Sequence, residues 1–515
     1  GNVFGPKYLW GRMLYNQNQC DGLQPASLRD LPLAGEYFAK SAAELMESPA
    51  AAYFDRGMRT MYTIRLARER SVTSLAPCDP EVWTNATEVA ELVRLVIAKD
   101  LANLGQWHWK DGYRSVQGDI QYDLRTSPAT TYWSLFLDVF HADLDPGQRG
   151  AVLGNLSVAI DGYLMDCAEW DWNFNNGNNW NAELGHGSMA WAIMRWHEEP
   201  DRARQVANCT LQALRAHARY YTESGEYPEG VSYSSVSMDG LLGILRLTLT
   251  AFGEGPAAFR PEVMSRFGDW VLDMMGPDAL LADFADCHLR RGHGNFHGLL
   301  AKLWGPMSAR NYDLSSLEPW LPCYTRAFFR NKWFDSGFRN PFLVDPVLAQ
   351  EWPLIAARCN VTVHAPALST FRVYPEGDRG GTAVLRSTPP EASAVDVCDE
   401  TALRRSQIEQ TYLAVSAINP NFAHTQWDFG TVIWAPYGHR FLADLSYGDL
   451  RQYNQWPSPY IELGPTGHNT LVVVEAGSRS TMQYRVGTVE AHPDALGLPV
   501  VDLDGSLPYG AVDTE

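Results

Sequence analysis

The chain has 515 residues and a formal net charge of −19 at pH 7; 45% of its residues are hydrophobic and 20% are charged. A single core stops growing at roughly 250–300 residues, so this globular composition predicts at least two domains. The negative charge argues against nucleic acid as a partner, because its binding depends on Lys and Arg that neutralise phosphates. No apolar run reaches the roughly 18 residues of a membrane span, so no membrane partner is expected either.

The N-terminal part of the chain is predicted to be helical. Residues 1–35 contain Gly, Pro and Asn and predict an irregular lead-in. Over residues 36–334, apolar side chains recur at the i, i+3, i+4, i+7 spacing of helices. The predicted runs cover about 37–47, 51–70, 89–97, 129–142, 147–166, 181–197, 201–222, 237–252 and 260–275. Paired helices without a fixed-period repeat favour an incomplete (α/α) toroid over an α-solenoid.

The C-terminal part, residues 335–515, is predicted to be a β-domain. Short β-rich runs alternate there with turn residues, and no long helix separates them. The runs cover 368–374, 382–386, 412–418, 431–436, 440–444 and 470–475. Short connections without crossover helices imply antiparallel strands. We therefore predict an α+β multidomain chain, with a helical toroid followed by an antiparallel β-sandwich.

The densest cluster of unusual residues lies at 170–188, which reads WDWNFNNGNNWNAELGHGS. Asn is poor in helix interiors because its amide competes for backbone hydrogen bonds, so a loop that enters a helix near Trp180 is expected. Amides bind hydroxyls and carboxylates, and indole rings such as that of Trp172 cover the apolar face of a sugar. The cluster fits a carbohydrate-binding cleft, but this stretch taken alone favours a capping loop with buried tryptophans.

A second candidate segment, YPEGVSYSSVS at 227–237, joins two predicted helices and places Tyr233 at a helix start. A phenol there is a feasible base if a nearby donor or cation lowers its pKa from about 10. The structural alternative is a tyrosine that packs at a helix terminus.

A third segment lies in the β-domain, where His424 and Asp428 precede a strand pair and Asp444 ends it. His468 follows at the head of another strand, and Gln426 lies between His424 and Asp428. His and Asp at neighbouring strand ends are a plausible set of ligands for a divalent metal ion.

One reaction uses these groups together, namely β-elimination on a uronic acid. The C5 proton is weakly acidic because the adjacent carboxylate is already negative, and donors that neutralise this carboxylate stabilise the intermediate. A Tyr or His then removes the proton, and a Tyr protonates the leaving O4. Asn179, Tyr233 and His424 can supply these roles from a cleft between the two domains.

The segments NNWNAELGHGS, SGEYPEGVSYS, FADCHLRRGHGNFHGLL, FAHTQWDFG, FLADLSYG and GHNTLVVV occur in an order that resembles the heparinase II/III-like polysaccharide lyases. Around YPEGVSYS the chain is also similar to dermatan sulfate epimerase. The resemblance covers roughly residues 85–475, and it implies an α/α toroid followed by a β-sandwich. It assigns carboxylate neutralisation to Asn179, or to Asn176 when the match is shifted, the acid/base role to Tyr233, and the sandwich histidine to His424.

The resemblance also implies one structural divalent metal ion. Metal-bearing members look like H-x-H-x-D, then a strand-end Asp, then the His of HNTL; here Gln426 replaces the second His, while Asp428, Asp444 and His468 remain. An oxygen ligand in place of imidazole shifts the preference from zinc toward Ca²⁺ or Mn²⁺. The predicted metal ligands are Gln426, Asp444 and His468.

We expect the substrate to be an anionic uronate polysaccharide or oligosaccharide. Residues predicted to contact it are Trp172, Trp180, Glu229, Arg290, Arg291 and Arg405. Alternative functions are a uronate C5-epimerase with the same site, a toroid glycoside hydrolase that uses paired carboxylates, and a non-catalytic glycan-binding protein. Carboxylate candidates for the hydrolase are Asp171, Glu183, Glu229 and Asp239.

The eight cysteines permit disulfides, but their spacing fixes no pairing. A secreted or periplasmic protein is expected. The oligomeric state stays open and includes a homodimer.

Overall fold

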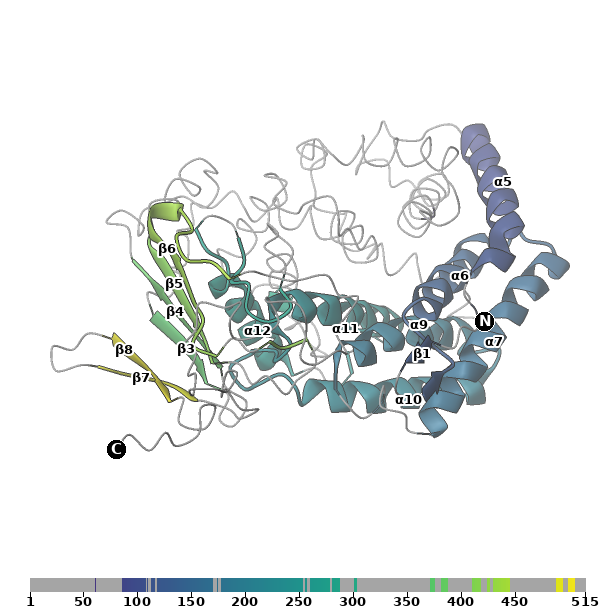
Figure 1. The fold of residues 1–515 in the computed structure, drawn as a ribbon. Coiled ribbons are helices and arrows are strands. Elements are labelled where there is room, and N and C mark those ends of the chain that lie inside the picture. Colours follow the sequence, from purple (N-terminus) through teal and green to yellow (C-terminus); the bar gives the residue numbers. More distant parts are fainter. Residues whose placement is uncertain are drawn as a thin grey trace.

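The structure is a computed structural model of the chain, with helices in its N-terminal part and antiparallel strands in its C-terminal part (Figure 1). The residues that it describes are 61, 86–107, 109, 113–115, 118–169, 174, 177–252, 255–256, 260–277, 280–287, 301–302, 371–375, 381–387, 410–417, 424–426, 429–444, 488–493 and 499–504.

The predicted helices within the described residues are confirmed. They are α5 (Ala86–Asn103), η3 (Leu104–Gln106), α6 (Thr126–Phe140), α7 (Pro146–Ala168), α9 (Asn179–Arg195), α10 (Pro200–Ala218), α11 (Gly230–Phe252) and α12 (Pro261–Asp273). A short hairpin of β1 (Tyr113–Ser115) and β2 (Gly118–Ile120), which was not predicted, precedes α6. The predicted run 37–47, and 51–70 apart from Met61, lie outside the described residues.

Helix α11 begins seven residues earlier than the sequence pattern indicated. Ser is often unfavourable within a helix, because its hydroxyl competes for backbone groups. In the structure, however, the hydroxyls of Ser234 and Ser235 both donate to the carbonyl of Val231, at 2.7 and 3.0 Å. These bonds within the first turn satisfy the serines without ending the helix.

Helix α9 is the centre of the helical part. It packs against α6, α10 and α11, and its residues are almost all buried. Glycines permit the close approach of these helices. A Cβ at Gly240 of α11 would lie 2.3 Å from the carbonyl oxygen of Ala182, and one at Gly187 would lie 2.4 Å from that of Ser127. The N-terminus of α9 is therefore held by packing along the whole helix.

A disulfide joins Cys167 at the end of α7 to Cys209 in α10. The loop that it closes contains the asparagine cluster and the start of α9. The other described cysteine, Cys287, is a buried thiol outside this disulfide.

Removal of this disulfide is expected to destabilise the fold. Closing a loop of 42 residues restricts the unfolded chain by roughly 4 kcal/mol in the chain-entropy model. We expect a clearly lower Tm for the Cys167→Ser/Cys209→Ser variant in thermal denaturation. A reductant should lower the Tm of the wild-type protein by the same amount and leave the Tm of the variant unchanged. If reduction still lowered the Tm of the variant, other disulfides would contribute to stability.

The four-stranded sheet has the order β3-β4-β5-β6, and each neighbouring pair is antiparallel, as predicted. The strands are β3 (Phe371–Pro375), β4 (Gly381–Arg386), β5 (Tyr412–Ser416) and β6 (Val432–Ala435). A further antiparallel hairpin, β7 (Thr488–Pro493) with β8 (Pro499–Asp504), was not predicted. The predicted strand at 470–475 lies outside the described residues.

The strand predicted at 440–444 is wrong. The residues there form only one isolated bridge, between Trp434 and Leu442. The reason lies in Arg440, whose guanidinium donates to the carbonyls of Leu280 and Leu281 at 3.1 and 2.7 Å. This segment therefore turns toward the helical part instead of extending the sheet, and Asp444 does not end a strand.

The sheet is joined to the C-terminal end of α12. The buried guanidinium of Arg386 in β4 donates to the carbonyls of Asp273 and Met275 at 2.7 and 2.6 Å. The hydroxyl of Tyr374 donates to the Asp273 carboxylate at 2.5 Å. A cation that satisfies the last carbonyls of a helix is favourable there. These bonds fix the sheet against the helices, and Figure 1 shows α12 as the labelled helix nearest to it.

Among the described residues, no helix combines the length and the apolar character that crossing a bilayer requires.

Candidate active site

The first part of the candidate site is the start of α9, where Asn179 is the first helical residue. The side-chain oxygen of Asn178 accepts from the backbone N–H of Trp180 at 3.0 Å, so Asn178 is the N-cap that the structural alternative expected. Gly177 has a φ of 69°, and a Cβ there would lie 1.9 Å from the ring of Tyr220. Only glycine fits this turn, which sets the direction in which the chain enters the helix.

His217 in α10, which was not predicted, holds this turn in place. Its Nδ1 lies 2.8 Å from the Gly177 carbonyl and 3.0 Å from the Asn178 carbonyl. Because two carbonyls can only accept, Nδ1 carries the proton, and Nε2 accepts from the hydroxyl of Ser237 at 2.6 Å. Burial lowers the pKa of His217 to about 4, so the imidazole is neutral at pH 7 and the turn carries no added charge.

Asn179 itself is buried, with 3% of its surface exposed. Its side-chain oxygen has no hydrogen-bond partner among the described residues. A carboxylate only accepts, so the group of Asn179 that can bind a carboxylate ligand is the amide nitrogen and not this oxygen. The positive end of the helix dipole favours negative charge at the same place.

Glu229 lies beside Asn179. Burial raises the pKa of Glu229 to about 8, a change that the backbone N–H of Asn179 opposes and the charge of Asp286 reinforces. At pH 7 this carboxyl is therefore mainly neutral, and it does not repel an anion bound at the helix start.

The pKa of Glu229 predicts a loss of stability as the pH rises. Its folded pKa of about 8 exceeds the ordinary 4.5, so the folded state binds more protons between these values and its contribution falls by roughly 3–5 kcal/mol across this window. We expect Glu229→Gln to remove this part of the slope and to be more stable than wild type at pH 8.5. Urea unfolding of both proteins at pH 5 and pH 8.5 measures the difference; equal slopes would contradict the prediction.

The second part of the site is formed where the start of α11 meets residues 284–287. Gly230 has a φ of 78°, and a Cβ there would lie 2.8 Å from the carbonyl oxygen of Phe284. The hydroxyl of Ser232 donates to the sulfur of Cys287 at 3.2 Å. Asp286 directly precedes Cys287 in the chain, so this contact places Asp286 next to the first turn of α11, which carries Tyr233.

Asp286 connects the helical part to residues 424–426. One carboxylate oxygen lies 3.1 Å from Nδ1 of His424, and the other accepts from Nε2 of Gln426 at 2.8 Å. The backbone N–H of Asp286 also donates to the carbonyl of His424 at 2.9 Å. Burial raises the pKa of Asp286, and the hydrogen bonds from the two side chains oppose that rise. Asp286 was not singled out from the sequence, although it lies in one of the segments that carry the family resemblance.

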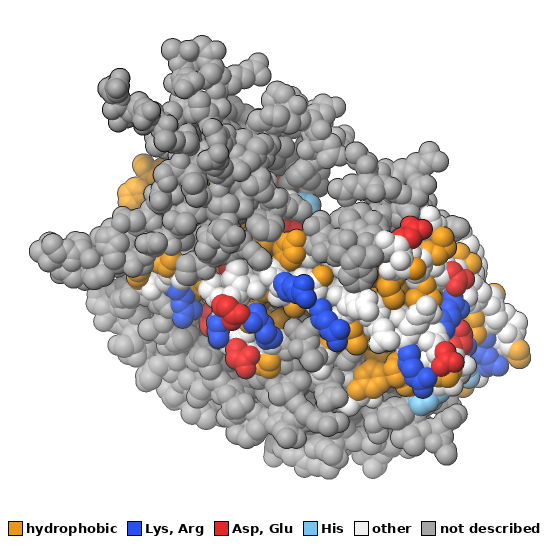
Figure 2. Space-filling model, turned by 90° about the horizontal axis from the view of Figure 1, so that it is seen from below, with side chains coloured by type: hydrophobic (Ala, Val, Ile, Leu, Met, Phe, Trp, Pro, Cys, Tyr) orange, Lys and Arg blue, Asp and Glu red, His pale blue; other side chains and the backbone are white. Residues whose placement is uncertain are grey.

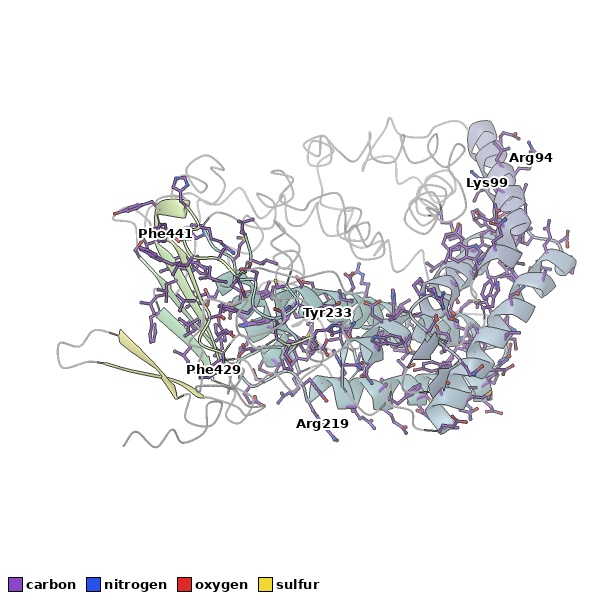
Figure 3. The ribbon with its side chains drawn as sticks, in the orientation of Figure 1. Arg94, Lys99, Arg219, Tyr233, Phe429 and Phe441 are labelled. Atoms are coloured by element: carbon purple, nitrogen blue, oxygen red, sulfur yellow. A yellow bond between two sulfur atoms is a disulfide. The ribbon has the colours of Figure 1, made fainter. Side chains whose placement is uncertain are left out.

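The structure brings Tyr233 and His424 into direct contact. Their rings are stacked, with centroids 3.5 Å apart and planes 8° apart. Tyr233 lies among the helices in Figure 3, whereas Phe441 lies at the sheet. Two of the three predicted catalytic groups, which come from different parts of the chain, are thus neighbours. The charge of Asp286, which bonds to His424, acts on Glu229, and Glu229 accepts from the backbone N–H of Asn179.

The structure describes only some of the other predicted site residues. Trp180 is half-buried and packs against the helical core. Glu183 and Asp239 lie at the contact of α9 and α11, where desolvation and then the charge of Asp239 raise the pKa of Glu183 well above its ordinary value. The following predicted residues lie outside the described residues: Asp171, Trp172, Asn176, Arg290, Arg291, Arg405, Asp428 and His468.

Two of the three predicted metal ligands, Gln426 and Asp444, are among the described residues, and both are buried. The amide nitrogen of Gln426 is used by Asp286, and its oxygen has no partner among the described residues, which leaves an oxygen ligand of the kind that Ca²⁺ or Mn²⁺ accepts. Within that part of the chain, no three His, Cys, Asp or Glu residues gather as a metal site. The divalent ion stays a prediction that also depends on His468.

The described surface on the face seen in Figure 2 carries basic and acidic side chains intermixed, not a patch of one sign. Arg260 and Arg266, for example, both pair with Glu223. The arginines that were predicted to contact the substrate, Arg290, Arg291 and Arg405, lie outside the described residues.

Neither a protein-family model nor a curated protein sequence matches the chain. The structure is similar to that of heparinase III, with a TM-score of 0.48 and 14% identity over 87% of this chain and 59% of that one. It is also similar to the chondroitin AC lyase of Streptomyces coelicolor A3 in complex with chondroitin sulphate, with a TM-score of 0.45 and 14% identity over 88% of this chain and 58% of that one. The chain thus spans less than two thirds of the length of either protein.

Proposed function

We propose that the chain is a polysaccharide lyase that cleaves a uronic-acid-containing polysaccharide by β-elimination. The observation that carries this proposal is the stacked pair of Tyr233 and His424. His424 is backed by Asp286, whose charge acts on Glu229 at the start of α9. An acid/base pair beside an anion-binding helix terminus is the combination that proton abstraction next to a carboxylate requires.

The substrate carboxylate binds at the start of α9 in this proposal. The Asn179 side-chain N–H and the positive end of the α9 dipole draw charge from the carboxylate, which acidifies the C5 proton and stabilises the carbanionic intermediate. The neutral state of Glu229 near pH 7 supports this role, because an ionised carboxylate there would oppose the substrate charge.

The reaction then moves one proton and breaks one bond. Tyr233 or His424 removes the C5 proton, the electron pair forms the C4–C5 double bond, and the bond from C4 to O4 breaks. Tyr233 donates a proton to the departing O4, so that one product has a new hydroxyl and the other has a 4,5-unsaturated uronate end.

The proposed site has a position between two domains, a metal ion nearby and a place outside the cytoplasm. The cleft lies between an incomplete (α/α) toroid at 36–334 and a β-sandwich at 335–515. One structural divalent ion is held by Gln426, Asp444 and His468, away from the reacting atoms. The protein acts outside the cytoplasm, where its polymer is found.

A screen of uronate polymers tests the function. The purified protein is incubated with alginate, hyaluronan, chondroitin, heparan, glucuronan and ulvan, and the ultraviolet absorbance of unsaturated uronate is followed. We expect absorbance with at least one polymer; its absence with every polymer would refute the lyase. Deuterium incorporated at C5 without cleavage would instead identify the C5-epimerase, and reducing ends without unsaturation would identify a hydrolase.

A further inference from the structure

We propose that Asp286 is a positioning residue that fixes the tautomer and the orientation of His424. Its effect on turnover rests on the proposed lyase function, whereas the tautomer is a property of the protein alone.

The hydrogen bonds of Asp286 are directed at one short segment. Asp286 is fully buried, and its two oxygens contact Nδ1 of His424 and Nε2 of Gln426 at 3.1 and 2.8 Å. Its backbone N–H donates to the His424 carbonyl at 2.9 Å. A single residue thus holds both the backbone and the ring of His424, and the side chain two residues further on.

The pairing determines which ring nitrogen carries the proton. A carboxylate can only accept, so Nδ1 of His424 is the protonated nitrogen, and the lone pair lies on Nε2 at the other side of the ring. A base or hydrogen-bond acceptor needs that lone pair directed away from the buried carboxylate. His424 retains 22% of its side-chain exposure, which suits a group that meets a substrate.

Two contacts together restrain the ring. The hydrogen bond from Nδ1 acts in the ring plane, while the Tyr233 ring covers a face of the imidazole at 3.5 Å. The backbone is also unusual, since His424 and Ala285 have φ values of 61° and 60°. Non-glycine residues in this region carry a conformational cost that surrounding contacts must offset, and such residues concentrate at functional sites.

Asp283 provides a matched control. It lies three residues before Asp286, is also fully buried, and its carboxylate accepts from Arg440 at 3.1 Å. Both carboxylates therefore tie the same segment to the sheet-bearing part of the chain, but only Asp286 contacts His424. If Asp286 had a purely structural role, removing either carboxylate would change kcat by a similar factor.

The kinetic test compares Asp286→Ala with Asp283→Ala in the full chain, on a polymer that the wild type cleaves. We expect kcat to fall roughly 100-fold in Asp286→Ala with KM within about threefold, because the loss concerns a group that acts in the transition state. The kcat of Asp283→Ala should stay within about threefold of wild type, although both variants melt at lower temperature. Equal kcat values in the two variants would overturn the proposal.

The tautomer is measured without any substrate, by two-bond ¹H–¹⁵N correlation spectra of wild type labelled at histidine, with the His424 signals identified by their loss in His424→Gln. We expect the Nδ1–H form in wild type and a shift toward Nε2–H in Asp286→Ala. An Nε2–H tautomer in wild type would refute the positioning role even if Asp286→Ala failed to fold. Absence of product from wild type with an Nδ1–H tautomer would refute the lyase and leave the role of Asp286 supported.

Discussion

Tyr233→Phe is expected to lower kcat by about 10³–10⁴-fold, at the upper end of the contribution of one general acid/base. The substitution removes only the hydroxyl, and the phenyl ring can keep the stack on His424 at 3.5 Å. Under the proposed mechanism the same hydroxyl protonates O4 and is a candidate to remove the C5 proton, so both halves of the reaction suffer. Initial rates of absorbance increase at saturating polymer measure the effect, and KM should change little.

The control for this substitution is Tyr437→Phe, which removes a phenol hydroxyl from a side chain that is 71% exposed. Its kcat should equal that of wild type. If Tyr233→Phe kept a tenth or more of the wild-type kcat, the acid/base role would have to move to another group.

Asn179→Ala is expected to lower kcat by about 10²–10³-fold, the size found when one preorganised donor to a developing charge is removed. The amide lies at the N-terminus of α9, where helix packing and the bonds from His217 to Gly177 and Asn178 fix the backbone. Asn179→Asp should lower kcat further, because it places a negative charge against the substrate carboxylate. Both effects are read from the same absorbance assay.

Two further asparagine variants complete this experiment. Asn155→Ala in α7, which loses a bond to the Ala151 carbonyl at 3.0 Å, should keep full activity. Asn176→Ala decides between the two asparagines that the family resemblance left open. A larger loss in Asn176→Ala than in Asn179→Ala would transfer the neutralising role to Asn176.

Local patterns were sufficient to predict most of the described helices and the first strands of the sheet. Helix α10 and strand β4, for example, begin within one residue of the predicted positions, because a repeated apolar face records which side of an element is buried. The same patterns failed where a distant partner decides the outcome. The segment at Arg440, for example, leaves the sheet for carbonyls 159 and 160 residues away. The early start of α11 was missed for a local reason, because its serines bond to a carbonyl within their own turn.

Some residues of the candidate site were likewise predictable from the sequence, and others were not. Asn179, Tyr233 and His424 were found because they lie in an amide cluster, at a predicted helix start and before a predicted strand pair, and because the order of these segments resembles a family. Asp286 has no such local signal, since the partner that gives it a role is 138 residues away. His217 is one of several polar residues in an amphipathic helix, and only its neighbours distinguish it.

Periodicity and composition were sufficient to predict the division into a helical and a β-part and the types of group available for chemistry. The folded chain was needed to show that Tyr233 stacks on His424, that Asp286 bonds to the imidazole, and that Glu229 is buried enough to hold its proton near pH 7. Ring contacts, hydrogen-bond direction and desolvation depend on distances between segments far apart in the chain, and such distances leave no mark on either segment alone.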